Sequence, residues 1–285
     1  MSEKPKNYEG WQSDVIVDLI KRYDFPYITL NPGASFRGLH DSLVNYGDNK
    51  PPMMLCNHEE IAVQIAHGYA KATGKPMAVI LHNLVGLLHA CMAIYYAYLD
   101  RVPIFIMGAT GPMDEAKRRP HIDWTHTALV QGNAVRDYTK WDYQPTSIDG
   151  VPESFARAYS IMMTEPKGPI YMCYDAALQE APKMHEVPLP PPGAVVTPSP
   201  MAPDPRAIEA IADKLVKAEH PMLLPEYAGR REGDSHGHQP RGWPRGVLHL
   251  PGGRGRGGRR RPVGSRRPGS RRTRCPWRGP TRRPR

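Results

Sequence analysis

Apolar positions follow two different spacings along the first part of the chain. Residues 13–23 (SDVIVDLIKRY) place apolar side chains at helical spacing, with Ser13 as a candidate N-cap. Short runs rich in Ile, Val, Leu and Met, such as MAVIL, show no period-two alternation, which is typical of strands in a sheet covered on both faces. These spacings predict strands at 27–30, 53–56, 77–81, 102–107, 138–141 and 169–174, and helices at 13–23, 36–46, 59–73, 86–99, 125–131 and 152–163.

The alternation of strands and helices indicates the fold class. Buried strands joined through helices by short connections imply right-handed crossovers, so we expect an α/β fold with a mostly parallel sheet and helices on both faces. Ligands bind such sheets at the carboxyl ends of the strands. The informative positions are therefore those directly after each strand, at 31–35, 57–59, 82–83 and 108–110.

Composition divides the chain into four parts. We expect a first domain over residues 1–175 and a Pro-rich linker over 176–203. A helix from Asp204 and a strand at 221–225 indicate the start of a second, central α/β domain at 204–228. The remaining residues, 229–285, form a tail of different character.

The charge of the chain is concentrated in this tail. The net charge of +10 at pH 7 by itself favours a nucleic-acid partner. However, residues 229–285 hold 18 Arg, no Lys and two acidic residues, which leaves residues 1–228 with a net charge of −6. The body is mildly acidic, and we expect it not to bind nucleic acid.

The tail also contains 13 Gly and 8 Pro, a composition that cannot bury a core, so we expect disorder. The body uses 12 Lys and 8 Arg, whereas the tail uses Arg alone. We favour the hypothesis that a frameshift near residues 229–234 truncates the chain and that the tail is out-of-frame sequence. The alternative is an Arg/Gly segment that binds RNA through charge and stacking.

Several classes of protein are disfavoured. Cys56, Cys91, Cys173 and Cys275 are far apart and form no CxxC pair, so we expect buried thiols and no metal site. No apolar stretch reaches the roughly 18 residues that a membrane span needs. The polar start of the sequence has no apolar signal core, and we expect a cytoplasmic protein with no membrane partner.

One stretch carries a specific resemblance. Residues 56–60 (CNHEE) run into residues 67–76 (HGYAKATGKP). This pattern resembles the pyrimidine-binding domain of thiamine diphosphate enzymes of the acetolactate synthase, benzoylformate decarboxylase and pyruvate decarboxylase group. In that family a strand ends in a glutamate, often preceded by His, and Gly-Tyr-Ala follows at nine residues. The spacing to Gly68 selects Glu59 over Glu60.

Further matches occur in the family's order along residues 11–175, with the start of its central domain at 204–228. They are Asn31-Pro32-Gly33 after the first strand, His82 and Gly86 after the third, Asp100-Arg101-Val102-Pro103 before a strand, and Thr139-Lys140-Trp141 and Gly168-Pro169-Ile170-Tyr171 in the late strands.

The resemblance implies thiamine diphosphate as cofactor, with Glu59 as the residue that activates it. In the family a carboxyl group hydrogen-bonded to a pyrimidine nitrogen converts the cofactor's 4′-amino group to the imino form that acts as the base. We expect a largely apolar pocket to raise the pKa of Glu59 for this role. Without the resemblance, Glu59 and Glu60 are first-turn carboxylates facing the positive end of a helix dipole.

The resemblance also suggests roles for the neighbours of Glu59. His82 matches a histidine that handles substrate protons in the benzoylformate decarboxylase branch; alternatively, it is a strand-end histidine satisfied by backbone. We expect Pro32, Gly33, Asn83 and Gly86 to contact the cofactor. The substrate-side candidates are Asn31, Ser35 and His58, of which His58 also orients the Glu59 region. For the loop residues His121, Asp123 and His126 we favour a solvated loop over a substrate contact.

Two departures from the family pattern bear on the substrate. Ala109 stands where many members carry Gln, and Asn83-Leu84-Val85 replaces a glycine-rich loop. Both argue against a typical acetolactate synthase. The sequence decides neither which 2-oxoacid is the substrate nor whether FAD is bound.

A second part of the family's cofactor site is not recognisable. The family holds Mg²⁺ and the diphosphate through Gly-Asp-Gly followed by Asn, and only Glu232-Gly233-Asp234-Ser235 is similar here. We expect the Mg²⁺ site to be absent, and a homodimer, a tetramer or a partner subunit to supply the diphosphate domain. The predicted function is therefore the thiamine diphosphate-binding region of a 2-oxoacid decarboxylase or carboligase. The alternatives are a non-catalytic pyrimidine-domain subunit and an RNA-binding protein acting through its tail.

Overall fold

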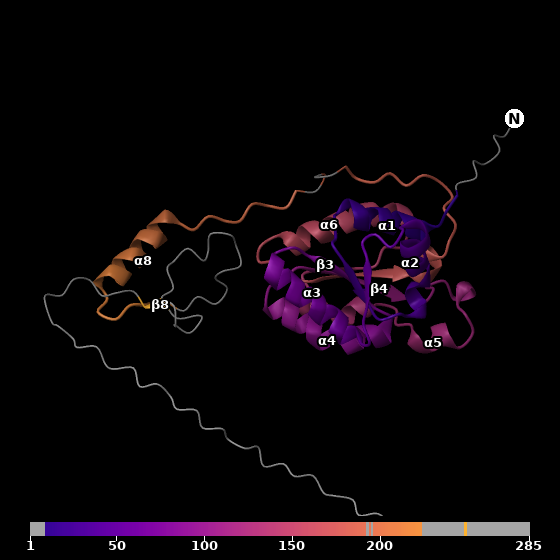
Figure 1. Ribbon diagram of the computed structural model, residues 1–285, viewed down its shortest axis with the longest axis horizontal. Helices are drawn as coiled ribbons and strands as arrows, with labels where there is room; N and C mark the ends of the chain where they lie inside the picture. The colour runs from indigo at the N-terminus through magenta and orange to yellow at the C-terminus, as the bar shows by residue number, and fades with distance from the viewer. Residues whose placement is uncertain (1–8, 192–193, 195, 224–247, 250–285) are drawn as a thin grey trace, which may run out of the picture. The chain divides into compact units, whose positions relative to one another are not determined.

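The computed structural model describes residues 9–191, 194, 196–223 and 248–249 (Figure 1). The described residues divide into two units, a first unit within residues 9–203 and a second unit of residues 204–223 and 248–249.

The first unit is built on a six-stranded parallel sheet with the order β2-β1-β3-β4-β6-β5. The register aligns Leu30 of β1 with Leu55 of β2 and with Ile80 of β3, so the carboxyl ends of these three strands lie at one edge of the sheet. The α/β class with a parallel sheet is confirmed. The strands are β1 (Ile28–Leu30), β2 (Met53–Leu55), β3 (Met77–Ile80), β4 (Ile104–Thr110), β5 (Asp142–Tyr143) and β6 (Ile170–Asp175).

Helices cover both faces of this sheet. Figure 1 shows α1, α2 and α6 on one side of β3 and β4, and α3 and α4 on the other. Alternate residues of β4 enter the two hydrophobic cores: Phe105 packs toward α1 and α6, and Ile106 toward α3 and α4. Such two-sided burial explains the apolar strands without alternation. The helices are α1 (Gln12–Arg22), α2 (Arg37–Asp41), α3 (Glu59–Thr73), α4 (Leu84–Leu99) and α6 (Val151–Met163).

The start of α1 differs from the prediction. The helix begins at Gln12 with Trp11 as N-cap, and the Asp14 carboxylate accepts the Trp11 backbone N–H at 2.8 Å. Ser13 is not the cap: it is fully buried, and its hydroxyl lies 2.7 Å from the hydroxyl of Ser42. A tertiary contact therefore uses the side chain that local sequence assigned to capping.

Three further elements differ in place or type. The helix predicted at 36–46 is divided into the 3-10 turn η1 (Ala34–Phe36), α2 and a π-helical turn η2 (Ser42–Tyr46). The prediction of a helix at 125–131 was wrong: α5 covers Ile122–His126, and a 3-10 turn, η4, covers Gln131–Ala134.

The strand predicted at 138–141 was also misplaced. It is a 3-10 turn, η5 (Arg136–Tyr138), followed by the edge strand β5. The Lys140 N–H still donates to the Pro169 carbonyl at 2.8 Å, so pairing with the sheet begins just before β5. An edge strand of so few residues is stabilised by pairing with the neighbouring strand, and its apolar residues show only a weak periodicity in the sequence.

The segment predicted as a linker begins with a short helix, α7 (Ala176–Gln179). Gln179 is buried, and its Nε2 donates to the carbonyls of Ser35 and Tyr174, each at 3.2 Å. These bonds tie the chain after β6 to the loop after β1, so residues 176–179 belong to the first unit.

In the second unit, α8 (Pro205–Lys217) begins at Asp204, whose side chain accepts the Arg206 N–H at 3.0 Å. β7 (Met222–Leu223) pairs antiparallel with β8 (Leu248–His249). Most of the Arg-rich tail, its proposed frameshift, Glu232–Ser235 and Cys275 lie outside the described residues. Within the part that the structure describes, no helix has the length and apolar character to cross a membrane.

Candidate functional site

The candidate site lies at the carboxyl ends of β1, β2 and β3. Asn31 follows β1, Glu59 begins α3 shortly after β2, and His82 follows β3. The parallel register brings these positions to one edge of the sheet, as the sequence predicted.

The Glu59 carboxylate is held in place by its neighbours. Its residue is 5% exposed, and each carboxylate oxygen has a partner. Asn31 Nδ2 donates to Oε1 at 3.1 Å, and His89 Nδ1 lies 3.1 Å from Oε2. His58, the N-cap of α3, accepts the Glu60 backbone N–H on its Nδ1 at 3.2 Å. The structure thus places Asn31 on the carboxylate itself.

The environment of Glu59 corrects one expectation. Burial raises the pKa of this carboxyl, as predicted, but burial is outweighed. Hydrogen bonds from its own backbone, from His89 and from Asn31 together hold the pKa of Glu59 below its usual range. The predicted apolar pocket in fact contains hydrogen-bond donors, which stabilise the carboxylate. The carboxyl group is therefore ionised near neutral pH.

His89 was missed by sequence reasoning. It comes from α4, and its ring stacks on that of His58 with centroids 4.8 Å apart and planes 18° apart. Residues 84–99 (LVGLLHACMAIYYAYL) contain no Lys, Arg, Asp or Glu, and His89 is their single histidine. A single histidine in an otherwise apolar helix was the feature of the sequence that could have identified His89 as a site residue. His89 lies one helical turn after Gly86, which marks the face that reaches Glu59.

His82 sits in a different setting. Its Nδ1 lies 2.9 Å from the hydroxyl of Ser35, which also accepts the Asn83 backbone N–H at 3.0 Å. The Ser35 hydroxyl has one proton and two lone pairs, so it either donates to Nδ1 or accepts a proton from it, according to the tautomer of His82. Burial first, then the neighbouring basic groups of His126 and Arg119, lower the pKa of His82, and together they outweigh Glu59, which raises it.

Two glycines make room for this arrangement. A Cβ on Gly33 would lie 2.6 Å from the His82 ring. A Cβ on Gly86 would lie 2.9 Å from the His82 Cβ and 3.2 Å from Glu59 Oε1. Pro32 is exposed, whereas Asn83 is buried and its Oδ1 has no hydrogen-bond partner. Gly86 and Asn83 thus border Glu59 and His82, while Pro32 makes no polar contact with either.

The loop before η4 corrects a second expectation. Asp123 is 2% exposed and is held by the Arg119 guanidinium at 2.8 and 3.0 Å. His126 is half-buried, and its ring lies 5.7 Å from that of His82 in an edge-to-face arrangement. A solvated loop was the wrong interpretation for these two residues and fits only His121, which is exposed.

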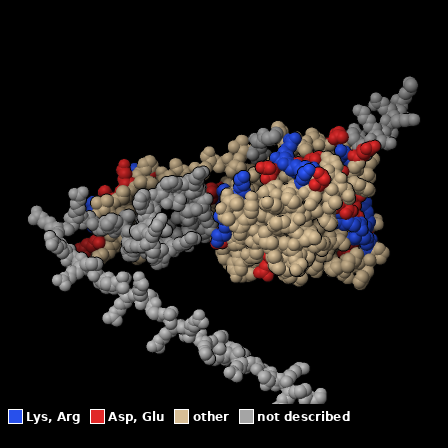
Figure 2. All heavy atoms as spheres, viewed as in Figure 1, with Lys and Arg blue, Asp and Glu red and all other residues tan. Residues whose placement is uncertain are grey.

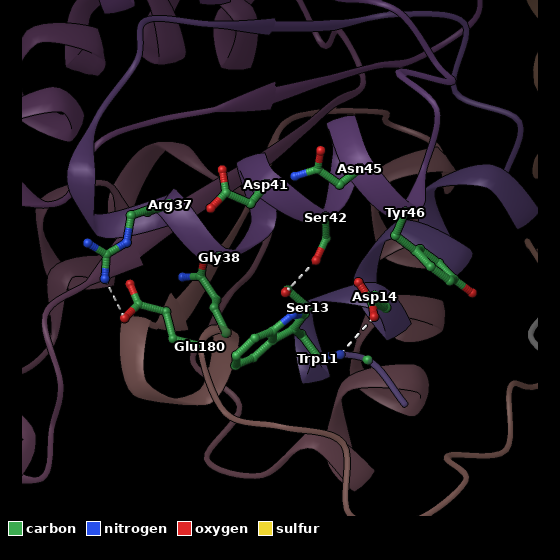
Figure 3. Close-up of a pocket in the computed structure, with 12 residues that line it drawn as sticks. Trp11, Ser13, Asp14, Arg37, Gly38, Asp41, Ser42, Asn45, Tyr46 and Glu180 are labelled. Atoms are coloured by element: carbon green, nitrogen blue, oxygen red, sulfur yellow. Dashed lines mark hydrogen bonds and ion pairs between the residues drawn. The ribbon is translucent and has the colours of Figure 1, made fainter. Parts of the chain in front are cut away.

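A separate hollow lies elsewhere in the first unit. A cavity of about 560 Å³ opens between the start of α1, α2, η2 and α7 (Figure 3). Trp11, Asp14, Arg37 and Glu180 are among its lining residues, and Arg37 is bonded to Glu180 at 2.8 Å. Neither Glu59 nor His82 borders it. The chemistry of the strand ends therefore identifies the site better than the size of this cavity does.

The Glu59 site has features that fit an aminopyrimidine. A buried carboxylate can accept a hydrogen bond from a protonated ring nitrogen. Oδ1 of Asn83, the residue after His82, has no hydrogen-bond partner and is a further acceptor. The missing Cβ of Gly86 leaves Glu59 Oε1 uncovered on that side. These observations match the donor and acceptor set of the cofactor's pyrimidine ring.

Comparisons with known proteins agree with this assignment. Residues 11–133 match the family described as thiamine pyrophosphate enzyme, N-terminal TPP binding domain. The chain is 29% identical over 159 residues to the acetolactate synthase large subunit of Lactococcus lactis, covering 55% of this chain and 26% of that protein. It is 26% identical over 215 residues to the "Probable 2-ketoarginine decarboxylase" of Pseudomonas aeruginosa, covering 73% and 36%.

A solved structure, benzoylformate decarboxylase from Polynucleobacter necessarius, is similar with a TM-score of 0.58 and 22% identity, covering 73% of this chain and 37% of that chain. At that identity the likeness supports the fold alone. The chain spans about a quarter to just over a third of the length of these proteins. Over residues 11–133, the chain is similar to the N-terminal TPP binding domain of thiamine pyrophosphate enzymes.

Proposed function

We propose that Glu59 is the carboxylate that activates thiamine diphosphate. The observation that carries this proposal is the buried, ionised Glu59 at the end of β2, held by Asn31 and His89. The cofactor, when bound, supplies a carbanion that adds to a carbonyl and then serves as an electron sink. Glu59 shares the proton of the pyrimidine nitrogen, while Gly86 and Asn83 border the ring and Gly33 supports His82.

On the substrate side we propose a proton-handling pair, His82 and His126. We assign neutral His82 the tautomer in which the Ser35 hydroxyl donates to Nδ1 and Nε2 carries the proton. His126 stands beside it and lowers its pKa, which keeps the imidazole neutral and able either to donate or to accept. His58 touches α3 and His89 rather than His82, so we assign it to positioning the Glu59 region.

For the whole protein we propose decarboxylation or carboligation of a 2-oxoacid. Support comes from the similarity to an acetolactate synthase and a decarboxylase. Ala109 and Asn83-Leu84-Val85 argue against a typical acetolactate synthase. Mg²⁺, which the family uses to hold the diphosphate, and FAD belong to parts of the family site that the first unit does not carry. Their use, the 2-oxoacid itself and the cytoplasmic location stay predictions.

We further propose that a second subunit, identical or different, covers α3 and α4. Figure 2 shows few charged side chains on the face of the first unit in view. α4 in particular exposes large apolar side chains along its length, an unusual surface for a free helix. The exposed apolar residues of the two helices are Ile61, Ile65, Val85, Leu88, Met92, Tyr95, Tyr96, Tyr98 and Leu99.

An aminopyrimidine titration tests the role of Glu59 in this chain. The chain is labelled with ¹³C at glutamate, and 4-amino-5-hydroxymethyl-2-methylpyrimidine is added while the carboxyl signals are followed by NMR. We expect a saturable shift of the Glu59 signal, abolished in Glu59→Gln and kept in Glu60→Gln, the adjacent matched control. A response that persists in Glu59→Gln removes Glu59 from the role.

A further inference from the structure

Three metal-ligating side chains meet at the start of α3. His58, Glu59 and His89 each offer a ligand atom, and these atoms all lie within 4.8 Å of one another. His58 and Glu59 are adjacent in sequence, whereas His89 arrives from α4, thirty residues later. The sequence therefore predicted no metal ligands here, because the set exists only once α3 and α4 pack together.

The distances approach those of a zinc site. Zinc binds imidazole nitrogen and carboxylate oxygen at about 2.0–2.2 Å, which places tetrahedral ligands about 3.3 Å apart. His89 Nδ1 and Glu59 Oε2 already lie 3.1 Å apart. His58 uses Nδ1 to accept the Glu60 N–H, so its Nε2 remains to bind an ion. The rings of His58 and His89 are stacked, so at least one ring must rotate about its side-chain bonds before both can point a nitrogen at one ion.

The charges and exposure also suit a cation. The carboxylate oxygens of Glu59 are ligands of a kind that zinc binds in proteins. The His89 side chain is 58% exposed, which gives an ion a path from solvent to the buried carboxylate. Two imidazoles favour Zn²⁺, Cu²⁺ or Ni²⁺ over Mg²⁺, which prefers oxygen ligands.

We propose that His58, Glu59 and His89 bind one divalent transition-metal ion, with zinc as the representative, and leave its fourth position open. A carboxylate oxygen that coordinates zinc is no longer available to a pyrimidine nitrogen. If Glu59 also activates thiamine diphosphate, a point that rests on the proposed function, then metal binding and cofactor activation exclude each other. The site acts as a metal-dependent block on the cofactor-binding domain.

Titration of the full chain with Co²⁺ and Zn²⁺ tests the site. Tetrahedral Co²⁺ gives a strong visible absorption, which Zn²⁺ then displaces, and neither measurement requires thiamine diphosphate. The three variants are His58→Asn, Glu59→Gln and His89→Asn. Asparagine is itself a good N-cap, so His58→Asn keeps the start of α3. His185→Asn, at an exposed histidine paired with Asp149, is the matched control.

We expect the wild-type chain and His185→Asn to bind one equivalent that gives the Co²⁺ absorption. Each of the three variants should weaken that equivalent by more than about tenfold, since even partners behind metal ligands contribute that much. His236 and His238 lie outside the described residues, and metal bound there is recognised because all variants retain it.

Unchanged affinity in the three variants, with far-UV circular dichroism and thermal unfolding equal to wild type, overturns the proposal. So does loss of binding in His185→Asn alone. Because the pyrimidine titration is run without metal and this one without pyrimidine, failure of the metal site and failure of the proposed function are seen separately.

Discussion

Glu59 and His82 lie at the same edge of the sheet, after β2 and β3, yet their surroundings favour opposite kinds of charge state. The partners of Glu59 donate hydrogen bonds, so they stabilise its anion. The surroundings of His82 are partial burial and the basic groups of His126 and Arg119, so they stabilise the neutral ring. Both pKa values move down, but one group becomes a fixed charge and the other stays uncharged. One pocket thereby holds an anionic proton acceptor next to a neutral imidazole.

The largest expected effect comes from removing the anion. In the enzyme that we propose, Glu59→Gln should lower kcat with a 2-oxoacid by about 10²–10⁴-fold, because the amide cannot take part in general acid–base catalysis. Thermal unfolding should change little, since glutamine retains a carbonyl for Asn31. Glu60→Gln is the control. Near-normal turnover in Glu59→Gln would assign the anion a purely structural role.

The next effect concerns the space around His82. Gly33→Ala should lower the free energy of unfolding by about 1–3 kcal/mol, because the new Cβ meets the half-buried His82 ring and forces it to shift. Urea denaturation measures this. Gly68→Ala is the matched control: a Cβ there has nothing within 4 Å, and we expect about 0.5–1 kcal/mol of stabilisation within α3. Equal behaviour of the two variants would show that Gly33 does not support His82.

A smaller effect concerns the proton of Glu59. His89→Leu should raise the pKa of Glu59, because it removes a hydrogen-bond partner of the anion. The sign follows from linkage: a depressed carboxyl pKa adds stability above the usual Glu value of about 4.3, and this is lost as pH falls through the folded pKa. In His89→Leu this contribution to stability should be smaller, because the folded pKa lies closer to the usual value. ¹³C NMR titration of the carboxyl measures it, with Leu88→Ala, at the exposed neighbouring position, as control.

The smallest effect concerns His82. His126→Gln should raise the pKa of His82, because a neighbouring cation is removed. A histidine whose pKa is lowered in the folded state reduces the free energy of unfolding as pH falls below about 6.5. This reduction should be smaller in His126→Gln. Proton NMR of the His82 ring follows the titration. His121→Gln, at the exposed histidine of the same loop, should leave it unchanged; an equal shift there would mean that His126 exerts no specific influence.

Many of the strands and helices could be predicted because buried parallel strands and amphipathic helices have strong local patterns of apolar residues. The runs that became β3, β4 and β6 were placed within two or three residues, and α3 was placed with both ends correct. The segment between β4 and α6 failed because its short helices and the edge strand β5 are stabilised by neighbours: Lys140 by Pro169, and Asp123 by Arg119. Such contacts have no local period.

The sequence by itself predicted Glu59, and not Glu60, as the functional glutamate, because the nine-residue spacing from Glu59 to Gly68 is a property of the chain. It also determined that Glu59 and His82 share an edge, since parallel strands align their carboxyl ends. Only the tertiary structure decided what surrounds them. Packing of α4 on α3 brought His89 onto the carboxylate and turned an expected apolar pocket into a site of donors. The direction of a pKa shift depends on partners distant in sequence, and folding alone supplies those.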